Sequence, residues 1–508
     1  MRKTKLIIFI ILIIILIIVF FYGIFGTGLS YLSSKEIKQN RKLNKSLINN
    51  LKINNINTIN DKNSNTYYYT LSKNYENKLY VLKLELEDGL KYKIIDETLN
   101  IIRVDYNKPI KIIIYNDKYY YETKVQLTNL PLINIETNSD ISTIDTNSIF
   151  TYIDYENNEI KYNNKIRIRG ASSKRFDKKS YKINIFDENY NEEKEINISN
   201  FYYGNSFILD SVYRDFSKIR NVLSTEIWNR ISDDFSTINI YSEFVELFIN
   251  NEYKGLYVFT EPINRRRLNL NKTIDNETSV VIKVQQWNYY NDDLNFSNIT
   301  SKTFLGYELK YPNDEDLYKI SWDKVLTNMF KYYEKGVESS YEIISSVFNI
   351  NNYIDMIIFN AFTNNVDNKL DKNNYLYLKS LEDNKIYIQP WDMEYTFGIK
   401  YTNENDKYVS KNMMDYNKVR TQFYHPNAPE INRLLIDRYW ELRKDILTRE
   451  YFDNLLDKYK NELSKGVALR DSKLWYEYDI EKEIEDIRIW LYNRLKYFDS
   501  YVRGLENE

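Results

Sequence analysis

Two aspartates lie at the ends of a predicted β-hairpin in the C-terminal half of the chain. Asp367 follows an apolar, helix-like segment, and Asp392 follows the apolar run Lys385-Ile-Tyr-Ile388. The strand-like residues Tyr375-Leu-Tyr-Leu378 lie between the two acids. If the two runs pair as a hairpin, their outer ends meet. The hairpin would then bring Asp367, Asn373 and Asp392 within reach of one another, although the acids are far apart in the sequence.

Carboxylate and amide oxygens are the ligands that hard cations such as Mg²⁺ and Mn²⁺ prefer. An Asp, an Asn a few residues later and a second Asp after a hairpin is the arrangement with which protein kinases orient a hydroxyl group and bind the metal on the phosphates. Asp and Asn also cap turns, and this sequence is rich in Asn, so the spacing alone leaves a structural role open. The aromatic surroundings of the acid in Pro390-Trp-Asp392 favour the catalytic interpretation. Glu394 is interpreted either as a helper of Asp392 or as a surface acid.

Composition excludes several other kinds of site. The 508 residues contain no cysteine, which excludes thiol catalysis, cysteine zinc sites, iron–sulfur clusters and disulfides. The single histidine, His425, lies in the loop-like stretch Tyr424-His-Pro-Asn-Ala-Pro429 and is predicted to be a surface residue. The net charge of −2 offers no overall attraction for nucleic acid, so we expect no nucleic-acid partner.

A kinase-like site also needs cations for the phosphates, and one stretch offers them. In the segment that starts at Ile166, a predicted strand ends at Gly170, a Ser-containing loop follows, and Lys178-Lys179 lead into the next strand. Such a hairpin could cover a nucleotide as a glycine-rich loop does, although one Gly falls short of the G-x-G-x-x-G pattern. A solvated basic turn is the alternative interpretation.

The N-terminus has the features of a membrane anchor. Arg2, Lys3 and Lys5 precede the uncharged apolar stretch from Leu6 to Phe25, which is about the length of a membrane-spanning helix. The positive flank predicts a single-pass anchor within residues 1–27, with the N-terminus inside and the bulk of the chain outside the cytoplasm. A cleaved signal peptide is the alternative, but no A-x-A-like cleavage site follows the stretch.

The rest of the chain predicts an α+β fold. Residues 28–65 are polar and rich in Asn, Lys and Ser, which is typical of a stalk. Short β-like runs over residues 66–132 indicate a small, sandwich-like β domain. Residues 133–503 alternate strands and helices and become strongly helical beyond Pro429. The strands we expect are 79–86, 110–115, 165–169, 180–186 and a hairpin of 243–249 with 255–260, and the helices are 222–231, 353–364, 431–448, 451–463 and 480–502.

Four blocks of sequence, taken in order, resemble the CotH kinase family, the spore-coat protein H type of atypical protein kinases. The resemblance covers about residues 130–503 and is carried by the order of the blocks more than by any one of them. The blocks are "LPLINIET" with "KIRIRGASSKRFDKKSYKINIF", "IRNVLSTEIWNR", "YSEFVELFINNEYKGLYVFTEPINRRRL" and "NNVDNKLDKNNYLYL" with "IYIQPWDMEYTFG". The resemblance implies an atypical protein-kinase-like domain with a helical C-terminal part.

The resemblance also implies roles for individual residues. Asp367 would be the catalytic Asp, Asp392 the metal-binding Asp and Asn373 the metal-binding amide. Because Asn373 lies one residue farther from Asp367 than the family pattern suggests, Asn374 stays an alternative. The residues that match nucleotide-linked positions are Arg169, Gly170, Lys178, Lys179, Arg220 and Glu261.

Two departures from the family pattern bear on local geometry. The usual Asn-Gly hairpin turn is Asn250-Asn251 here, which is expected to relax the turn because Asn accepts a positive φ less readily than Gly. Ala171 replaces the usual Asn after Arg-Gly, which puts in doubt how closely that loop covers a nucleotide.

The function implied by the resemblance is transfer of phosphate from ATP, with Mg²⁺ or Mn²⁺, to Ser or Thr of a protein substrate. The expected partner is a Ser-rich coat or surface protein, and the expected location is the extracytoplasmic side of a membrane. The alternative from another class is a membrane-anchored surface interaction or adhesin-like protein that keeps an inactive kinase fold. Retention of both acids and of Asn373 favours the kinase.

Overall fold

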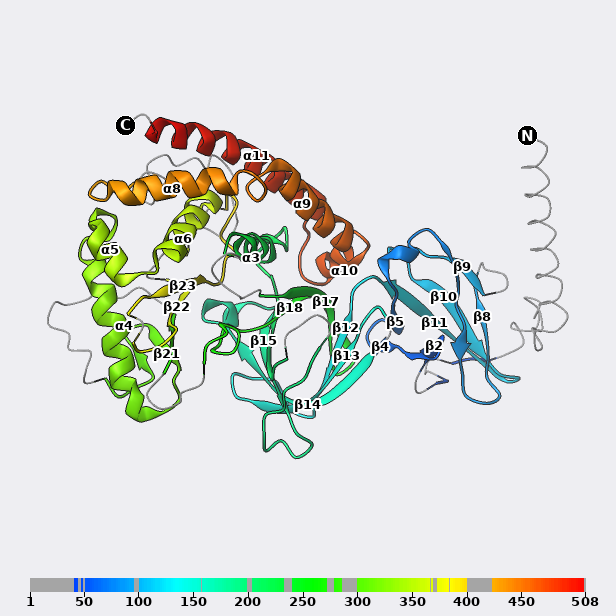
Figure 1. Cartoon of the computed structure of the whole chain (residues 1–508). Helices are drawn as coiled ribbons and strands as arrows, with labels where there is room; N and C mark the ends of the chain where they lie inside the picture. The colour runs from blue at the N-terminus through cyan, green and yellow to red at the C-terminus, as the bar shows by residue number, and fades with distance from the viewer. Residues whose placement is uncertain are drawn as a thin grey trace, which may run out of the picture. The chain divides into compact units, whose positions relative to one another are not determined.

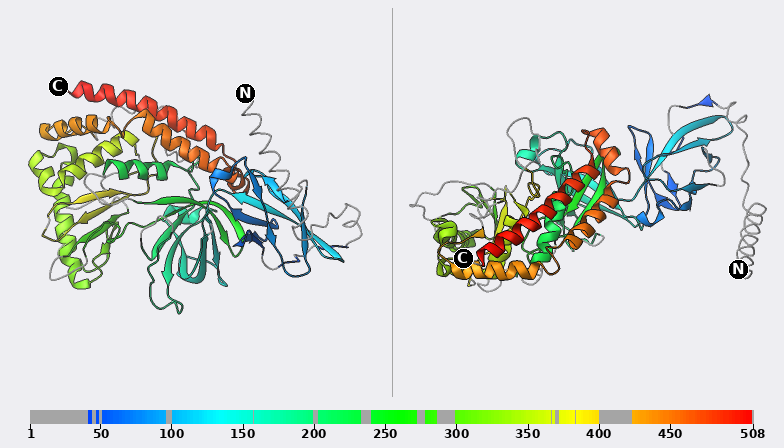
Figure 2. Two further views of the ribbon diagram at one scale, coloured as in Figure 1. Left: turned by 45° about the vertical axis from the view of Figure 1, so that its right-hand side comes forward. Right: turned by 90° about the horizontal axis from the view of Figure 1, so that it is seen from above.

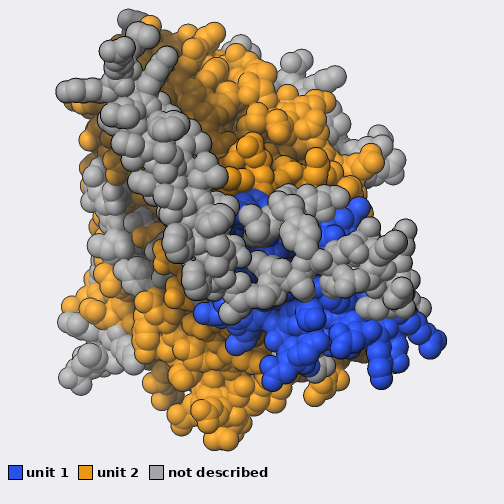
Figure 3. Space-filling view, turned by 90° about the vertical axis from the view of Figure 1, so that its right-hand side faces the viewer, with its two compact units in different colours: residues 1–58, 81–102, 110–125 blue, residues 59–80, 103–109, 126–508 orange. Residues whose placement is uncertain are grey.

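The computed structural model divides the chain into two units, which are coloured separately in Figure 3. Unit 1 comprises residues 1–58, 81–102 and 110–125, and unit 2 comprises residues 59–80, 103–109 and 126–508. The units interleave in the sequence, whereas the sequence predicted consecutive segments with boundaries at about residues 27, 65 and 132. The structure describes residues 41–43, 47–48, 51–95, 100–156, 158–198, 203–232, 240–271, 278–285, 299–365, 367–368, 372–382, 384–399 and 423–506.

The predicted membrane anchor, residues 6–25, lies outside the described residues. Among the residues that are described, no helix combines the length and the apolar character needed to cross a bilayer.

Unit 1 consists of short β-strands. Strand β10 pairs antiparallel with both β8 and β11, and β2 pairs antiparallel with β3 and β7. The expected strand 110–115 is confirmed as β10, whereas the expected strand 79–86 is broken into β6 and β7. The bounds of the strands that lie wholly or partly in unit 1 are β1 Arg41–Lys42, β2 Lys52–Ile53, β3 Ile56–Asn57, β6 Leu79–Val81, β7 Leu84–Glu85, β8 Lys91–Ile94, β9 Ile101–Arg103, β10 Ile110–Tyr115 and β11 Tyr119–Thr128.

Short strands also lie within the range for which composition predicted an irregular stalk. Strands β2 and β3, together with β4 (Ile59–Asp61), fall between residues 28 and 65. Ile53 and Ile59 explain the difference, because both side chains are buried and their burial stabilises the local strand structure. In unit 2, β4 forms a hairpin with β5 (Thr66–Thr70).

Seven strands of unit 2 close into a barrel in the order β12-β13-β14-β15-β16-β18-β17 (Figure 1). Alternate residues such as Ile166, Ile183, Phe207 and Phe259 point into its core, as expected from the period of two of a β-strand. The predicted strands 165–169 and 180–186 and the hairpin 243–260 are confirmed, but closure of the barrel was not predicted. The bounds are β12 Leu132–Glu136, β13 Thr146–Ile153, β14 Glu159–Arg169, β15 Ser180–Phe186, β16 Ser206–Asp210, β17 Ser242–Ile249 and β18 Glu252–Thr260.

The turn between β17 and β18 keeps a tight geometry without glycine. Asn250 and Asn251 have φ values of 53° and 61°, the left-handed pair that a type I′ turn requires. The Oδ1 atom of Asn250 accepts a hydrogen bond from the backbone N–H of Thr137 at 2.8 Å. The expectation that Asn251 relaxes this turn is therefore wrong, because side-chain hydrogen bonds stabilise the left-handed backbone.

A five-stranded sheet forms the second β element of unit 2, in the order β20-β21-β19-β22-β23. The predicted hairpin of β22 with β23 is confirmed, with Leu376 opposite Ile388. The bounds are β19 Val280–Val284, β20 Thr303–Phe304, β21 Tyr307–Tyr311, β22 Asn374–Leu378 and β23 Tyr387–Pro390.

Helices pack around this sheet and one side of the barrel, and α9 and α11 run side by side in all three views (Figures 1 and 2). The central helix α6 is buried along nearly its whole length, since every residue from Asn352 to Thr363 is buried. The chain is thus mixed α+β, with strands in its N-terminal part and helices in its C-terminal part. The bounds are α3 Arg220–Ile231, α4 Tyr318–Tyr333, α5 Tyr341–Val347, α6 Ile350–Thr363, α8 Pro429–Leu442, α9 Arg449–Leu463, α10 Val467–Leu474 and α11 Ile480–Leu505.

His425 is a core residue, so its predicted surface position is wrong. Its side chain is fully buried, and its Nε2 atom lies 2.8 Å from the hydroxyl oxygen of Tyr353 on α6. The imidazole fills the space between α6 and the start of α8, where an aromatic ring packs as well as an aliphatic side chain does. Burial lowers the pKa of His425 to about 4, because the charged form would lose its hydration.

The buried histidine predicts acid sensitivity. Because the folded-state pKa lies below the ordinary value of 6.5, the stabilisation is complete above pH 6.5 and is lost as the pH falls toward 4. Between pH 7 and pH 4.5, the free energy of unfolding should fall by about 2 to 3 kcal/mol more in the unmodified chain than in a His425→Gln variant. Urea denaturation at the two pH values measures the difference. Equal losses in both proteins would contradict the assignment.

Candidate functional site

The outer end of the β22–β23 hairpin brings the predicted site residues together. Asn374 pairs with Pro390 at the last position of the ladder, and the backbone N–H of Trp391 donates to the carbonyl of Asn373 at 3.0 Å. The Nδ2 atom of Asn373 donates to the Oδ2 atom of Asp367 at 2.9 Å. Asp367, Asn373 and the residue before Asp392 are therefore joined by a continuous chain of hydrogen bonds.

Asp367 is positioned by the end of α6. Arg494 of α11 donates from Nε to the carbonyl of Phe362 at 3.0 Å and from Nη2 to the carbonyl of Ala361, so the last turn of α6 is capped by a buried cation. Beyond the helix, the Asp367 carboxylate forms an ion pair with Lys372. The result is a half-buried carboxylate with one face toward Asn373.

The side chains of Asn373 and Asn374 point to different places. Asn373 is half-buried, has a φ of 56° and contacts Asp367. Asn374 is fully buried, and its Nδ2 atom donates to the carbonyl of Lys372 at 3.0 Å. Of the two amides, Asn373 is the one whose side chain belongs to the cluster around Asp367.

Asp392 presents its carboxylate to solvent from a strained backbone. Its φ is 60°, in the left-handed region that Asp tolerates better than most residues but still at some cost in energy. Although part of the residue is exposed, the surrounding protein removes some of the water near its carboxylate, which raises its pKa; the negative charges of Asp210 and Asp367 raise the pKa further, while Arg169 and Lys283 act in the opposite direction. Two cations and three carboxylates thus lie close enough to influence one another.

Glu394 belongs to the same cluster and is not a plain surface acid. It is half-buried, and its pKa is raised well above its usual range by loss of hydration and then by the charges of Asp392 and Asp210, with Arg214 opposing them. A carboxyl group in this position either holds a proton beside Asp392 or, when it is ionised, is available to bind a cation.

Sequence reasoning did not find Asp210. It is the last residue of β16, where the apolar strand Ser206–Asp210 ends in an acid. Its carboxylate accepts from the hydroxyl of Ser180 at 3.2 Å and from the Nδ2 atom of Asn221 at 3.4 Å. An acid that directly follows a buried strand was the signal that marked Asp392, and the same signal was present here.

Lys283 was missed as well. It is the one charged residue in β19, Val280-Val-Ile-Lys-Val284, and is half-buried opposite Glu308 and Tyr375 on the neighbouring strands. Loss of hydration and the nearby charge of Arg169 lower its pKa to about 8. Within the described residues, no hydrogen bond or ion pair engages the side chain of Arg169 or of Lys283.

Helix α3 fixes the segment that carries Asp392. Asn221, Ser224 and Trp228 lie on one face of this helix at a spacing of three and four residues. The Oδ1 atom of Asn221 accepts from the Met393 N–H at 3.1 Å, the Ser224 and Thr396 hydroxyls are 2.9 Å apart, and the Trp228 indole donates to Gln389 at 3.0 Å. Three polar contacts therefore hold residues 389–396 against α3.

Residue 170 is a glycine because a larger side chain would not fit in this turn. Its φ is 108°, and a Cβ atom there would collide with the Ser173 side chain of the following short 3₁₀ turn, Ser172–Arg175. The Nζ atom of Lys179 donates hydrogen bonds to the backbone carbonyls of Lys174 and Phe176, and these bonds link the end of the loop to its middle. Arg169 enters this turn and is the one of these residues that contributes charge to the Asp392 cluster.

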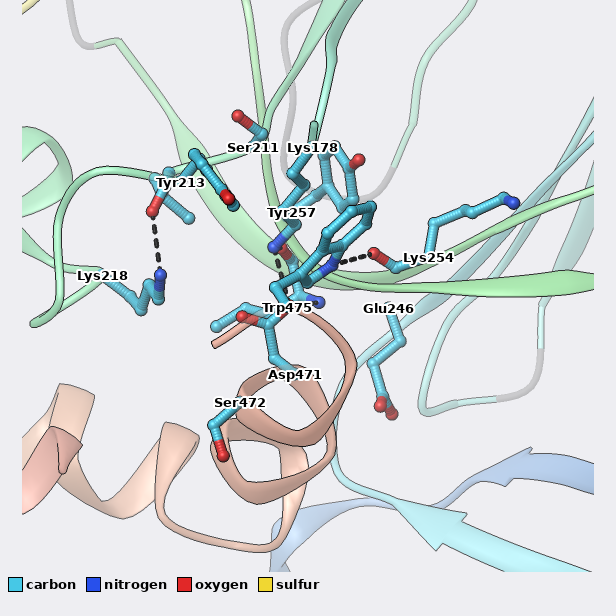
Figure 4. A network of polar contacts seen from close by, with 12 residues as sticks. Lys178, Ser211, Tyr213, Lys218, Glu246, Lys254, Tyr257, Asp471, Ser472 and Trp475 are labelled. Carbon is cyan, nitrogen blue, oxygen red and sulfur yellow. Dashed lines mark hydrogen bonds and ion pairs between the residues drawn. The ribbon is translucent and has the colours of Figure 1, made fainter. Parts of the chain in front are cut away.

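Lys178 is engaged in a buried ion pair. Its Nζ atom donates to Asp471 Oδ1 on α10 at 2.7 Å and to the Leu256 carbonyl at 2.6 Å, and the side chain is fully inaccessible to solvent (Figure 4). The same carboxylate oxygen accepts from the Leu256 N–H at 2.9 Å. Lys178 therefore joins the barrel to α10, and a phosphate could reach it only if this contact opened. Sequence alone could not reveal a partner almost three hundred residues away.

Arg220 and Glu261 also have protein partners. Arg220, the first residue of α3, donates from Nη1 to Asp215 Oδ1 at 2.6 Å, and both side chains are almost wholly buried. Glu261, which follows β18, forms a buried ion pair with Arg267. These contacts give both residues a structural function beside any role in nucleotide binding.

The residues around Asp392 fit a divalent metal that keeps water and phosphate among its ligands. Within the described residues, no three acids converge closely enough to bind a metal alone. Mg²⁺ commonly binds through one or two carboxylates together with substrate phosphates. The carboxylates of Asp210, Asp392 and Glu394 lie near enough for their charges to influence one another, and a divalent cation would neutralise part of that charge.

The buried pair of Lys178 with Asp471 predicts a large effect on stability. Lys178→Met should leave a buried carboxylate without its cation and lower the free energy of unfolding by about 3 to 5 kcal/mol. The double variant Lys178→Met with Asp471→Leu should recover part of that loss. Urea denaturation measures both.

Lys179→Met is the matched control, because Lys179 is adjacent and only half-buried. It should change the free energy of unfolding by less than about 1 kcal/mol. If Lys178→Met instead left stability unchanged and abolished nucleotide binding, the structural assignment of Lys178 would be wrong.

Comparison with known proteins adds one match. The model of a family described as CotH kinase protein matches residues 166–498, well over half of the chain. The match begins within β14 and ends within α11, so it includes the Gly170 turn, α3 and the β22–β23 hairpin. No curated protein matches the chain.

Proposed function

Because the chain belongs to the CotH kinase protein family, we propose that it is an atypical protein kinase that transfers the γ-phosphate of ATP to Ser or Thr of a protein substrate. Membership of a family named for kinase activity supports phosphoryl transfer in general. The acceptor type, the metal and the nucleotide site are proposals that depend on the residues described above.

One observation carries the proposal: Asp367, Asn373 and Asp392 converge at one end of a hairpin with Arg169 and Lys283 beside them. Phosphoryl transfer needs little covalent chemistry from the protein. It needs acids that bind a metal, cations that bind the phosphates and a carboxylate that orients the attacking hydroxyl. These groups are the ones gathered here.

In this proposal Asp392 and the Oδ1 atom of Asn373 bind Mg²⁺ or Mn²⁺. The Nδ2 end of Asn373 is already engaged with Asp367, which leaves its oxygen as the available ligand atom. The bound metal would neutralise charge on the phosphate oxygens. Lys283 and Arg169 would take the remaining phosphate charge, and their influence on the Asp392 carboxylate supports this role.

Asp367 orients the acceptor hydroxyl and accepts its proton as the new phosphate ester forms. Asn373 and Lys372 fix the direction of this carboxylate. Proton transfer to a positioned carboxylate of this kind is worth about 10² to 10⁴ in rate.

A membrane anchor and a Ser-rich surface or coat protein as acceptor complete the proposal. The anchor rests on the basic residues that precede the apolar stretch from Leu6 to Phe25. The acceptor rests on the family resemblance.

The test is transfer from labelled ATP by the purified full-length chain with Mn²⁺ or Mg²⁺, to itself or to a Ser-rich acceptor protein. Asp367→Asn should lower transfer by about 10² to 10⁴ and leave nucleotide binding near normal. Asp392→Asn should abolish metal-dependent nucleotide binding, as calorimetry would show. Asp445→Asn is the control, because Asp445 is exposed and distant from the hairpin in the sequence.

Equal transfer by the unmodified chain and Asp392→Asn would contradict the metal assignment. Absence of both transfer and nucleotide binding in the unmodified chain would favour the surface interaction protein with an inactive fold.

A further inference from the structure

A single buried amide, Asn368, contacts the backbone on both sides of the hairpin end. Its Nδ2 atom donates to the carbonyl of Asn373 at 2.8 Å and to the carbonyl of Trp391 at 3.0 Å. Asn373 is one proposed metal ligand, and Trp391 directly precedes the other, Asp392. Asn368 itself directly follows Asp367, so one side chain connects the three segments of the candidate site.

The neighbouring acceptors determine which way the amide of Asn368 points. Its NH₂ group donates to two backbone carbonyls, whereas its Oδ1 atom is buried and has no hydrogen-bond partner within the described residues. If the amide were turned over, Oδ1 would face two carbonyl oxygens, which are acceptors as well. A buried acceptor without a partner costs free energy, and the two donated hydrogen bonds help to offset that cost.

The two hydrogen bonds from Asn368 also act on strained backbone. Asn373 has a φ of 56°, and Asp392, which follows Trp391, has a φ of 60°. The left-handed region is costly for residues other than glycine, so such a conformation persists only where the surroundings fix it. Because the peptide unit is planar, a hydrogen bond to a carbonyl also fixes the orientation of the N–H group that follows it. Asn368 therefore restrains the backbone at both proposed metal ligands.

The end of α6 holds Asn368 in place. The backbone N–H of Asn368 donates to the Oδ1 atom of Asn365 at 3.1 Å, and the backbone N–H of Asn365 donates to the carbonyl of Asn360 in α6 at 3.2 Å. The side chains of Asn365 and Asn368 are both almost wholly buried. The position of the two donors is thus determined by the buried helix, and their spacing does not vary with the solvent-exposed groups around them.

Resting on the proposed metal site, we propose that Asn368 is a positioning residue that sets the separation of the two metal ligands, the Asn373 amide oxygen and the Asp392 carboxylate, and so adapts the site to a small octahedral cation such as Mg²⁺. Mg²⁺ requires near-ideal octahedral geometry with short metal–oxygen distances, whereas Ca²⁺ accepts a wider and more variable arrangement of ligands. Rigid spacing therefore favours Mg²⁺ over Ca²⁺. Because its side chain is buried, Asn368 acts through the two ligands and not by touching the metal.

The test compares the Mg²⁺ and Ca²⁺ complexes of a non-hydrolysable ATP analogue, whose affinities for the full-length chain are measured by calorimetry. Asn368→Leu keeps the approximate size of the side chain and removes both donors. We expect this variant to bind the Mg²⁺ complex about tenfold more weakly and the Ca²⁺ complex less than about threefold more weakly, because loosely spaced ligands still suit the larger ion. A purely structural role would weaken both complexes alike.

Asn129→Leu is the matched control. Asn129 is also buried, its Nδ2 atom donates to a backbone carbonyl, that of Glu462, at 2.9 Å, and its Oδ1 atom has no partner within the part of the chain that is described. Because Asn129 makes none of the contacts of the hairpin end, the affinities for both complexes should change by less than about twofold. Asn368→Ser is a milder variant that keeps one donor, and its ratio of the two affinities should lie between those of the unmodified chain and Asn368→Leu.

Hydrogen exchange without any ligand tests the hydrogen bonds of Asn368 separately from the metal. The N–H of Trp391 donates to the carbonyl of Asn373, which Asn368 also holds. In a peptide that contains Trp391, followed by mass spectrometry, this N–H should exchange about tenfold faster in Asn368→Leu than in the unmodified chain or in Asn129→Leu.

Equal weakening of both metal complexes in Asn368→Leu, or no change in either, would overturn the proposal, as would unchanged exchange at Trp391. In those cases the unmodified chain still binds the Mg²⁺ complex, and the proposed metal site stands. If the unmodified chain binds neither complex, the proposed metal site fails, and the role of Asn368 in the choice of metal fails with it.

Discussion

The pairing of β22 with β23 is the constraint on which the candidate site depends. Because Asn374 lies opposite Pro390, the residues just outside the ladder, Asn373 and Trp391, are joined by a backbone hydrogen bond of 3.0 Å. A shift of register by one residue would turn the side chains of the shifted strand to the opposite face and so move Asn373 away from Asp367. The buried residues of the two strands oppose such a shift, so the apolar core determines where the acids lie.

The same core also brings several carboxylates close together, which costs free energy because like charges repel. The negative charge of Asp210 raises the pKa of both Asp392 and Glu394, the charge of Asp392 raises that of Glu394 further, and Asp392 also has a left-handed backbone. Such features persist only where the surroundings over-determine them, and they gather at functional sites. Here the surroundings are the polar face of α3, the capped end of α6 and the turns of the hairpin. In a site of this kind the charged groups already lie in position without a ligand. Binding of a cation and an anionic ligand would then require little reorganisation before phosphoryl transfer.

The sequence predicted what depends on local pattern. The alternation of apolar and polar residues predicted strands β14, β15, β17 and β18, and helical spacing predicted helices α6 and α11. The expected hairpin correctly predicted that Asp367 and Asn373 lie close together. The sequence did not predict what depends on distant partners. In the sequence Lys178 resembles a phosphate ligand, whereas in the structure its side chain pairs with Asp471. His425 likewise resembles a surface loop residue, whereas in the structure it is bonded to Tyr353 of α6. Tertiary packing also closes the barrel and brings Asp210 and Lys283 near Asp392. The hydrophobic periodicity of a sequence carries no information about such packing.

The central claim is that the hairpin end at Asp392 binds a metal–nucleotide complex for phosphoryl transfer. A crystal structure of the full-length chain with Mn²⁺ and a non-hydrolysable ATP analogue tests it most directly, because the anomalous signal of manganese locates the metal independently of the protein. The account predicts a manganese peak in contact with the Asp392 carboxylate and the Asn373 amide oxygen, with the γ-phosphate facing Asp367. A manganese peak elsewhere, or an analogue bound away from this hairpin, would contradict it.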